Sequence, residues 1–218
     1  MTLPKVYPIL DTGTLAHKGC SALHAAVGLL AGGAQILQFR HKGQWTRETF
    51  AEAEEIARMC REARVPLIVN DRADFALLLD CGLHIGQDDL YPTDARRLLG
   101  PDRTIGFSTH NAGQLTAAAL EPIDYIALGP IYRTISKENP DPEVGTGNLR
   151  MWLNMWRTLV LRPLVAIGGI TRENARAVLD AGADSVAVIG DLLPDARTGL
   201  SMRAIRARME EWRQLTAN

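Results

Sequence analysis

Short apolar runs alternate with longer amphipathic segments along the whole chain. The apolar runs predict eight buried strands, at residues 6–10, 36–39, 66–70, 83–85, 104–107, 125–128, 163–167 and 185–189. The other segments predict helices near residues 20–32, 46–63, 73–79, 92–99, 111–119, 148–158, 172–181 and 200–215. The pattern therefore predicts eight strand–helix units in regular alternation.

The segment at residues 46–63 shows the helical pattern well. Thr46 stands where a helix cap is expected. Apolar side chains then recur at the spacing of one helix face, at Phe50, Ala53, Ile56, Ala57 and Cys60. We expect this face to pack on the core.

Eight strand–helix units in 218 residues favour an α/β fold of the (β/α)8 TIM-barrel type over an open sheet. No Gly/Ser-rich linker or low-complexity block divides the chain. We therefore expect residues 1–218 to form a single (β/α)8 barrel domain.

Charge and hydropathy argue against several classes of partner. The 24 Lys and Arg residues nearly balance 25 Asp and Glu residues, for a net charge of −1, so nothing favours nucleic acid. No apolar run approaches the roughly 20 residues of a membrane span. The first ten residues, MTLPKVYPIL, do not resemble a signal peptide. We expect a soluble, cytoplasmic protein with no membrane partner.

The three cysteines, Cys20, Cys60 and Cys81, are odd in number and far apart in the sequence. No C-x-x-C pair or Cys/His cluster occurs, so the pattern supports neither a zinc site nor a disulfide framework. We expect buried, reduced thiols.

Polar side chains follow the predicted strands, where the active sites of (β/α)8 barrels lie. Gln38, Arg40 and Lys42 follow the second strand, and strand alternation directs all three to one side. Two cations and an amide at the barrel mouth suit a phosphate or pyrophosphate. A solvated loop with an incidental ion pair is the alternative, and the spacing alone does not choose between them.

Carboxylates follow the next two strands. Asp71 and Asp89 form the natural pair for a hard cation such as Mg²⁺, which binds through one or two carboxylates together with substrate phosphates. The alternatives are an ion pair of Asp71 with Arg72, and a helix N-terminal role for Asp89 ahead of Pro92.

The fifth strand ends near Ser108, which can bind an anion or, with Thr109 and Asn111, cap the following helix. We favour a capping role for Asn111 and leave Ser108 open. His84 and His110 have no nucleophile beside them in the sequence, so we assign them no chemistry.

Glycines follow the last two strands. Gly168 and Gly190, with Ile189, can bring backbone N–H groups close to a phosphate. Tight turns that need positive φ are the alternative. The loop at 129–145 is long for a structural connection and carries Arg133, Thr134, Ser136 and Lys137, which suit an anion.

Seven segments together resemble the thiamine phosphate synthase family, which includes a thiazole tautomerase branch. They occur in family order from the second strand to the eighth: QFRHK (38–42), VNDR (69–72), GLHIGQDDL (82–90), GFSTHN (106–111), DYIALGPIYRTISK (124–137), PLVAIGGI (163–170) and ADSVAVIG (183–190). The resemblance implies a (β/α)8 barrel and a transferase that joins hydroxymethylpyrimidine diphosphate to hydroxyethylthiazole phosphate. Its products are thiamine phosphate and pyrophosphate.

The resemblance also implies a dissociative route and a role for each matching residue. Pyrophosphate leaves first, and the thiazole nitrogen captures the pyrimidine methyl cation. Such chemistry needs charge neutralisation and positioning more than a base. Mg²⁺ is implied at Asp71 and Asp89, and a pyrimidine contact at Gln38. The implied pyrophosphate ligands, of which Arg40, Lys42 and Lys137 are the catalytic candidates, are Arg40, Lys42, Asn70, Ser108 and Lys137.

The thiazole phosphate is implied to bind at backbone amides of Gly168, Ile189 and Gly190, beside Thr134 and Ser136. The loop at 129–145 would then act as a lid, with Lys137 closing on pyrophosphate. The family usually has Thr where Ser136 stands, Ser where Gly190 stands, and Asp-Gly where this chain has Cys81-Gly82. The N-terminal strand also matches the family poorly.

Three other functions remain open from the sequence. A thiazole tautomerase would share the barrel but would expel no pyrophosphate, so the retained cations and carboxylates argue against it. A non-catalytic homologue that binds thiamine phosphate would fit the Gly190 change. A phosphosugar isomerase would need a paired acid and base, which we do not find. The sequence leaves open the oligomeric state, a homo-oligomer included, the rates and the metal preference.

Overall fold

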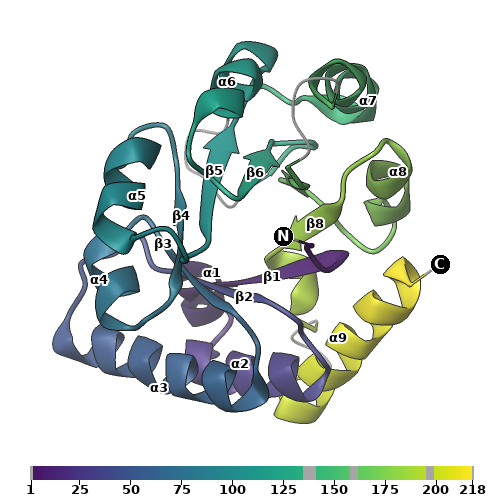
Figure 1. Cartoon of the computed structure of the whole chain (residues 1–218). Coiled ribbons are helices and arrows are strands. Elements are labelled where there is room, and N and C mark those ends of the chain that lie inside the picture. The colour runs from purple at the N-terminus through teal and green to yellow at the C-terminus, as the bar shows by residue number, and fades with distance from the viewer. Residues whose placement is uncertain (1, 135–140, 158–161, 195–198, 218) are drawn as a thin grey trace.

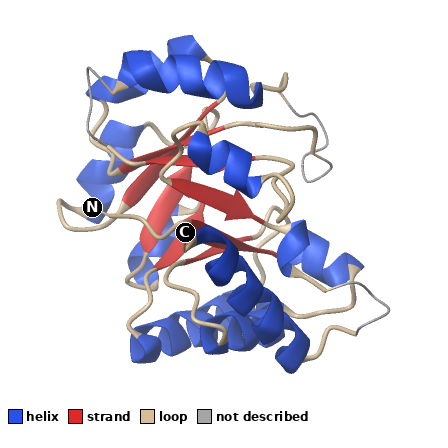
Figure 2. Cartoon of the chain, turned by 90° about the vertical axis from the view of Figure 1, so that its right-hand side faces the viewer, coloured by secondary structure: helices blue, strands red, loops and turns tan. Residues whose placement is uncertain are grey.

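The computed structural model describes residues 2–134, 141–157, 162–194 and 199–217. Eight parallel strands pair in chain order and close into a barrel, with β8 beside β1. Helices surround the barrel, with α9 and α2 packed together on the outside (Figure 1). In a view turned by 90°, the strands occupy the middle of the molecule and the helices lie around them (Figure 2). The predicted (β/α)8 barrel is confirmed.

The strands are β1 (Val6–Asp11), β2 (Leu37–Arg40), β3 (Leu67–Asn70), β4 (Gly82–Ile85), β5 (Ile105–Thr109), β6 (Tyr125–Leu128), β7 (Leu164–Ile167) and β8 (Ser185–Val188). The α-helices are α1 (Thr12–His17), α2 (Ala22–Ala31), α3 (Arg47–Ala63), α4 (Ala73–Leu78), α5 (Pro92–Leu99), α6 (Ala112–Ala117), α7 (Gly145–Trp156), α8 (Ala175–Asp180) and α9 (Met202–Thr216). The described residues also form two 3₁₀-helices, η1 (Ala118–Leu120) and η2 (Gly190–Leu192).

All eight predicted strands and all eight predicted helices are present, with ends shifted by at most three residues. The short helix α1 was not predicted, because it buries only Leu15 and so has no apolar repeat. Both helix caps predicted from the sequence are confirmed. Thr46 Oγ1 accepts the Thr49 N–H at 3.2 Å at the start of α3, and Asn111 caps α6.

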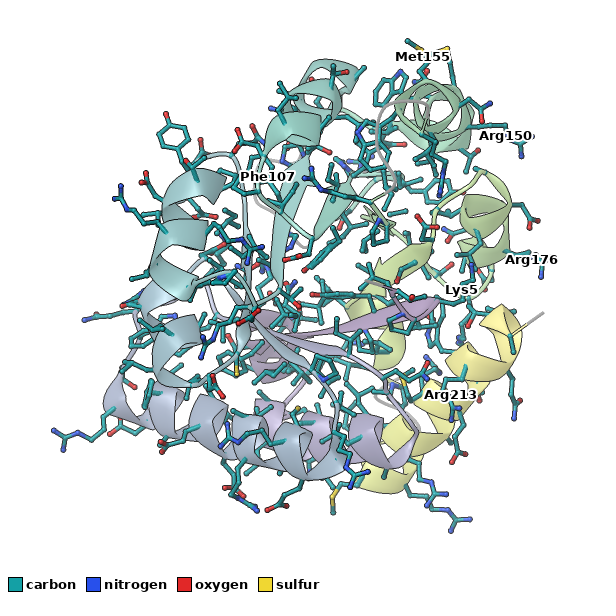
Figure 3. The ribbon with its side chains drawn as sticks, viewed as in Figure 1. Lys5, Phe107, Arg150, Met155, Arg176 and Arg213 are labelled. Carbon is teal, nitrogen blue, oxygen red and sulfur yellow. The ribbon has the colours of Figure 1, made fainter. Side chains whose placement is uncertain are left out.

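Strand alternation divides the core into two clusters of buried side chains. The larger lies between the strands and the helices and includes Phe39. The smaller fills the barrel interior and combines alternate strand positions with two residues that precede strands, Leu3 and Ile36. Its members are Leu3, Tyr7, Ile9, Ile36, Ile68, Tyr125, Ala127, Val165 and Ala187. Charged side chains such as Arg150 and Arg176 point outward from α7 and α8 (Figure 3).

The three cysteines are free and buried, as predicted. Burial raises the pKa of the Cys60 and Cys81 thiols, so they are protonated at neutral pH. None of the described helices is long and apolar enough to span a membrane.

Candidate active site

A cavity of about 680 Å³ opens at the carboxyl ends of the strands, and all eight strand ends contribute to it. Every predicted site residue that the structure describes lines this cavity: Gln38, Arg40, Lys42, Asn70, Asp71, Asp89, Ser108, Thr134, Gly168, Ile189 and Gly190. Ser136 and Lys137 lie outside the described residues. The barrel thus gathers residues from seven separate sequence segments into one site.

The end of β2 supplies two cations of the cavity, Arg40 and Lys42. Gln38, Arg40 and Lys42 line it, whereas Phe39 belongs to the outer core and His41 bonds Thr12 at 2.7 Å. Nζ of Lys42 lies 2.6 Å from Oδ2 of Asp71. Arg40 forms an ion pair with Asp11. Both cations therefore have carboxylate partners and also face the cavity.

Asp11 supports this site through Arg40, and the sequence reasoning missed it. Its side chain is buried, accepts the Thr14 N–H at 2.8 Å at the start of α1, and pairs with Arg40. It caps α1 and holds the Arg40 guanidinium at the barrel mouth. Its position at the end of β1 was the available signal, because the other strand ends carry the site.

Asp71 and Asp89 face each other across the ends of β3 and β4. The pKa of the Asp71 carboxyl is raised, chiefly by burial and further by the neighbouring Asp89 carboxylate, while Lys42 opposes the shift. Asp71 has φ +64°, and its N–H donates to the His84 carbonyl at 2.8 Å. Two carboxylates in contact form an electrostatically costly pair that a cation would stabilise.

The alternative roles of the two carboxylates do not occur. Arg72 pairs with Asp74 rather than with Asp71. Oδ2 of Asp89 accepts the Gly86 N–H at 2.7 Å, and α5 begins at Pro92 with no side-chain cap. Asp71 therefore does not pair with Arg72, and Asp89 makes its backbone contact with Gly86 rather than capping α5.

The donor set fits Mg²⁺. Asp71 and Asp89 offer carboxylate oxygens, which hard cations prefer. Among the described residues, no group of three or more His, Cys, Asp or Glu side chains is arranged to hold a metal ion by itself. A two-carboxylate site leaves most coordination positions to water and to phosphate oxygens of a ligand, which is the usual arrangement for Mg²⁺.

Asn70 lies between the cations and the carboxylates at the end of β3. It is 5% exposed, and its Nδ2 is buried without a hydrogen-bond partner. An unsatisfied buried donor costs about 1–3 kcal/mol, which an acceptor oxygen in the cavity would offset.

His84 and Ser108 form part of the cavity floor. Nε2 of His84 lies 2.9 Å from Oγ of Ser108, and its Nδ1 lies 3.0 Å from the Tyr125 hydroxyl. Burial lowers the pKa of His84 to about 4, so the ring is neutral at neutral pH. Asn111 caps α6, which leaves the Ser108 side chain to the cavity floor. The sequence offered no signal for this histidine beyond its place at a strand end.

Glycines form the opposite wall. Gly168 has φ +99°, and a Cβ there would lie 2.6 Å from Cα of Pro130. This position needs glycine for its turn, as the alternative interpretation holds, and it also lines the cavity. Gly190 differs, because a Cβ there would meet nothing within 4 Å. Its N–H begins the short η2 helix beside the cavity.

His110 lies at the edge of this wall and was assigned no role from the sequence. Its Nδ1 donates to the Gly129 carbonyl at 2.6 Å and lies 3.4 Å from the Asp141 carboxylate. These contacts hold the start and the return of the β6–α7 connection near the end of β5. His110 therefore shapes the cavity wall.

Fold and site together define a (β/α)8 barrel with a cationic, carboxylate-bearing wall opposite a glycine wall, which is the arrangement of an enzyme for two phosphorylated ligands. A family model described as thiamine monophosphate synthase matches residues 6–192. The chain belongs to this family.

Individual relatives support the assignment. The chain is 48% identical over 200 residues to the thiamine-phosphate synthase of Koribacter versatilis, covering 90% of this chain and 92% of that protein. It is 38% identical over 204 residues to that of Chloroflexus aurantiacus, covering 93% and 91%. Among solved structures, the thiamine phosphate pyrophosphorylase of Pyrococcus furiosus superposes with a TM-score of 0.80 at 29% identity, covering 98% and 95% of the chains.

Proposed function

We propose that this chain is a transferase that joins hydroxymethylpyrimidine diphosphate to hydroxyethylthiazole phosphate, forming thiamine phosphate and releasing pyrophosphate. The relatives that match over most of the chain are named thiamine-phosphate synthase. The observation that carries the proposal is the gathering of Arg40, Lys42, Asp71 and Asp89 around one cavity. A tautomerisation has no leaving pyrophosphate for these groups to bind.

The diphosphate is proposed to bind at the cationic wall. Arg40, Lys42 and Lys137 neutralise its charge, Asn70 donates its unpaired Nδ2, and Ser108 donates from the floor. Asp71 and Asp89 hold Mg²⁺, which when bound offsets the charge of the leaving pyrophosphate. Gln38 contacts the pyrimidine ring beside them.

The thiazole phosphate is proposed to bind at the glycine wall, through backbone N–H groups of Gly168, Ile189 and Gly190, with Thr134 and Ser136 alongside. The C–O bond to pyrophosphate breaks first, and its electron pair leaves with pyrophosphate. The thiazole nitrogen then donates its lone pair to the pyrimidine methyl cation. The two walls hold the partners on either side of this cation, so positioning and charge neutralisation supply the catalysis.

The test is release of pyrophosphate and formation of thiamine phosphate by the purified protein with both substrates, with and without Mg²⁺. Metal-dependent turnover that is lost in Asp89→Asn and Lys137→Ala would support the proposal. No turnover with tight binding of thiamine phosphate would indicate a non-catalytic binding protein. Conversion of a thiazole tautomer without pyrophosphate release would indicate the tautomerase branch.

We also propose that residues 1–218 act as one domain and that the enzyme works in the cytoplasm. Whether it forms a homo-oligomer is a question for light scattering of the purified protein. The sequence and the site fit small-molecule substrates, and nothing in the charge balance favours a nucleic-acid partner.

A further inference from the structure

Five polar side chains from five strands form one hydrogen-bonded chain inside the barrel. Nε2 of Gln38 donates to the Tyr7 hydroxyl at 3.2 Å, and the Tyr7 and Tyr125 hydroxyls lie 2.8 Å apart. The Tyr125 hydroxyl lies 3.0 Å from Nδ1 of His84, whose Nε2 lies 2.9 Å from Oγ of Ser108. We call this set, Gln38–Tyr7–Tyr125–His84–Ser108, the interior chain.

The two ends of the interior chain line the cavity, and its middle is sealed beneath the floor. Gln38, His84 and Ser108 are cavity-lining residues. Tyr7 and Tyr125 are at most 1% exposed and pack among the aliphatic side chains of the inner core. The interior chain therefore connects two points of the active site through a region that water does not reach.

The barrel makes room for this connection at Gly106. Gly106 lies between His84 on β4 and Tyr125 on β6 in the strand register. A Cβ on Gly106 would lie 2.0 Å from Cζ of Tyr125 and 2.3 Å from its hydroxyl oxygen. The glycine thus lets the phenol cross β5 and stack on the His84 ring, with ring centroids 5.6 Å apart.

The titratable members of the interior chain are neutral at neutral pH. Burial raises the pKa values of Tyr7 and Tyr125 well above the ordinary value of a tyrosine, and it lowers the pKa of His84 to about 4. Each link therefore needs one donor and one acceptor, and the direction of one link sets the direction of the next.

The direction follows from Gln38. Its amide nitrogen can only donate, so the Tyr7 hydroxyl accepts there. Tyr125 is the other hydrogen-bond partner of that hydroxyl, so Tyr7 satisfies its own buried proton by donating to Tyr125. Tyr125 then donates to Nδ1 of His84, which places the ring proton on Nε2. Nε2–H donates to Ser108, whose own hydroxyl proton is left to point into the cavity.

Rotation of the Gln38 amide by half a turn reverses every link. Tyr7 would then donate to Oε1, and Ser108 would donate to His84 instead of to the cavity. Ser108 would present only lone pairs to an anion, which repels them. The orientation of one amide thus determines whether Ser108 can donate to a bound anion.

We propose that Tyr7, Tyr125 and His84 are positioning residues that transmit the orientation of the Gln38 amide to the Ser108 hydroxyl. The proposal rests on the proposed function for its ligands. The amino group of the pyrimidine donates to Oε1 of Gln38, which keeps Nε2 on Tyr7 and so directs the Ser108 proton at the pyrophosphate. Recognition of the ring therefore strengthens the hold on the leaving group.

The proposal makes a prediction about His84 that needs no activity. Nitrogen NMR of the ¹⁵N-histidine protein should show a neutral ring protonated on Nε2, with the signal assigned by its loss in His84→Gln. A ring protonated on Nδ1 would reverse the interior chain and overturn the proposal.

The kinetic test uses Tyr125→Phe, which removes one hydroxyl and keeps the ring. Tyr91→Phe is the control, because Tyr91 is 75% exposed and does not line the cavity. We expect Tyr125→Phe to lower kcat about 10- to 100-fold, the range for one hydrogen bond to a charged group. KM for the thiazole phosphate should not change. The control should match the wild type.

A double-variant comparison separates positioning from general destabilisation. Once Ser108→Ala is present, Tyr125→Phe should have little further effect on kcat, because both changes remove the same donor. If the two substitutions instead lower kcat independently, so that their fold-losses multiply in the double variant, the proposal is overturned. If Tyr125→Phe does not fold, Tyr7→Phe breaks the interior chain one link earlier and takes its place.

Failure of the proposed function is distinguishable from failure of this proposal. If the wild type forms no thiamine phosphate, the proposed function fails. Calorimetry with inorganic pyrophosphate and an aminopyrimidine alcohol then tests the coupling alone. Pyrophosphate should bind more tightly when the alcohol is present, and this gain should vanish in Tyr125→Phe. An equal gain in both proteins would overturn the proposal.

Discussion

Nζ of Lys42 lies 2.6 Å from Oδ2 of Asp71, which joins the ends of β2 and β3 across the barrel mouth. In the proposed reaction Lys42 binds a phosphate oxygen, whereas Asp71 would hold Mg²⁺. In the unliganded protein they neutralise each other. The Lys42 side chain is 55% exposed, so this ion pair contributes at most about 1 kcal/mol to stability. Its importance lies in binding.

Lys42→Met should therefore weaken binding of the diphosphate with little loss of stability. We expect KM for hydroxymethylpyrimidine diphosphate to rise about tenfold or more, since a charge-assisted hydrogen bond contributes about 1.5–3 kcal/mol. Steady-state kinetics and urea unfolding measure the two effects. Lys5→Met is the control, because Lys5 is exposed and precedes β1, at the other end of the barrel. An unchanged KM would remove Lys42 from the diphosphate site.

Asp11→Asn should destabilise the protein more than a surface substitution. The amide keeps an oxygen for the Thr14 N–H but turns a donor toward Arg40, whose side chain is 15% exposed. Breaking a largely buried ion pair costs about 3 kcal/mol or more. Urea unfolding measures the loss, and Asp74→Asn, at an exposed pair with Arg72, is the matched control. Similar small losses in both variants would show that the Asp11 pair adds no more than a surface one.

Two glycine substitutions should have opposite outcomes. Gly190→Ser should fold normally and lower KM for the thiazole phosphate, because its Cβ meets nothing within 4 Å and its hydroxyl can donate to the phosphate. Gly168→Ala should lose stability, because it combines φ +99° with a 2.6 Å approach to Pro130. Thermal unfolding and kinetics measure both. An increase in KM for Gly190→Ser would place the phosphate elsewhere.

His84 should make the protein less stable in acid. Burial lowers the pKa of His84 from 6.5 to about 4. Between pH 6.5 and pH 4 the unfolded chain therefore binds a proton on this ring that the folded protein does not. Above pH 6.5 the ring is neutral in both states and causes no loss of stability. As the pH falls from 6.5 toward 4, the free energy of unfolding decreases by about 3 kcal/mol in all.

Urea unfolding at pH 7.5 and pH 4.5 measures this effect. Other groups titrate over the same range, so the wild type is compared with His84→Gln, which carries no titrating ring. The wild type should lose more stability between the two pH values than the variant. Equal losses would mean that His84 is accessible to protons in the folded protein.

The sequence by itself determined the barrel and the strand-end residues of the cavity that were predicted as its binding groups. Apolar runs specified the strands because buried strands need apolar side chains, and strand alternation placed Gln38, Arg40 and Lys42 on one side. Parallel strands in a closed barrel bring their carboxyl ends together, so residues at those ends share a site wherever they lie in the chain.

Only the tertiary structure decided which of these residues touch. The hydroxyls of Tyr7 and Tyr125 meet across 118 positions of sequence, and the Arg40–Asp11 and Lys42–Asp71 pairs each join residues 29 apart. No local period relates such positions, because barrel closure and register bring them together. In the structure Asp71 pairs with Lys42 and not with the alternative partner Arg72, and His84 forms part of the cavity floor. Contacts between distant residues depend on the packing of the whole barrel, which no short stretch of sequence encodes.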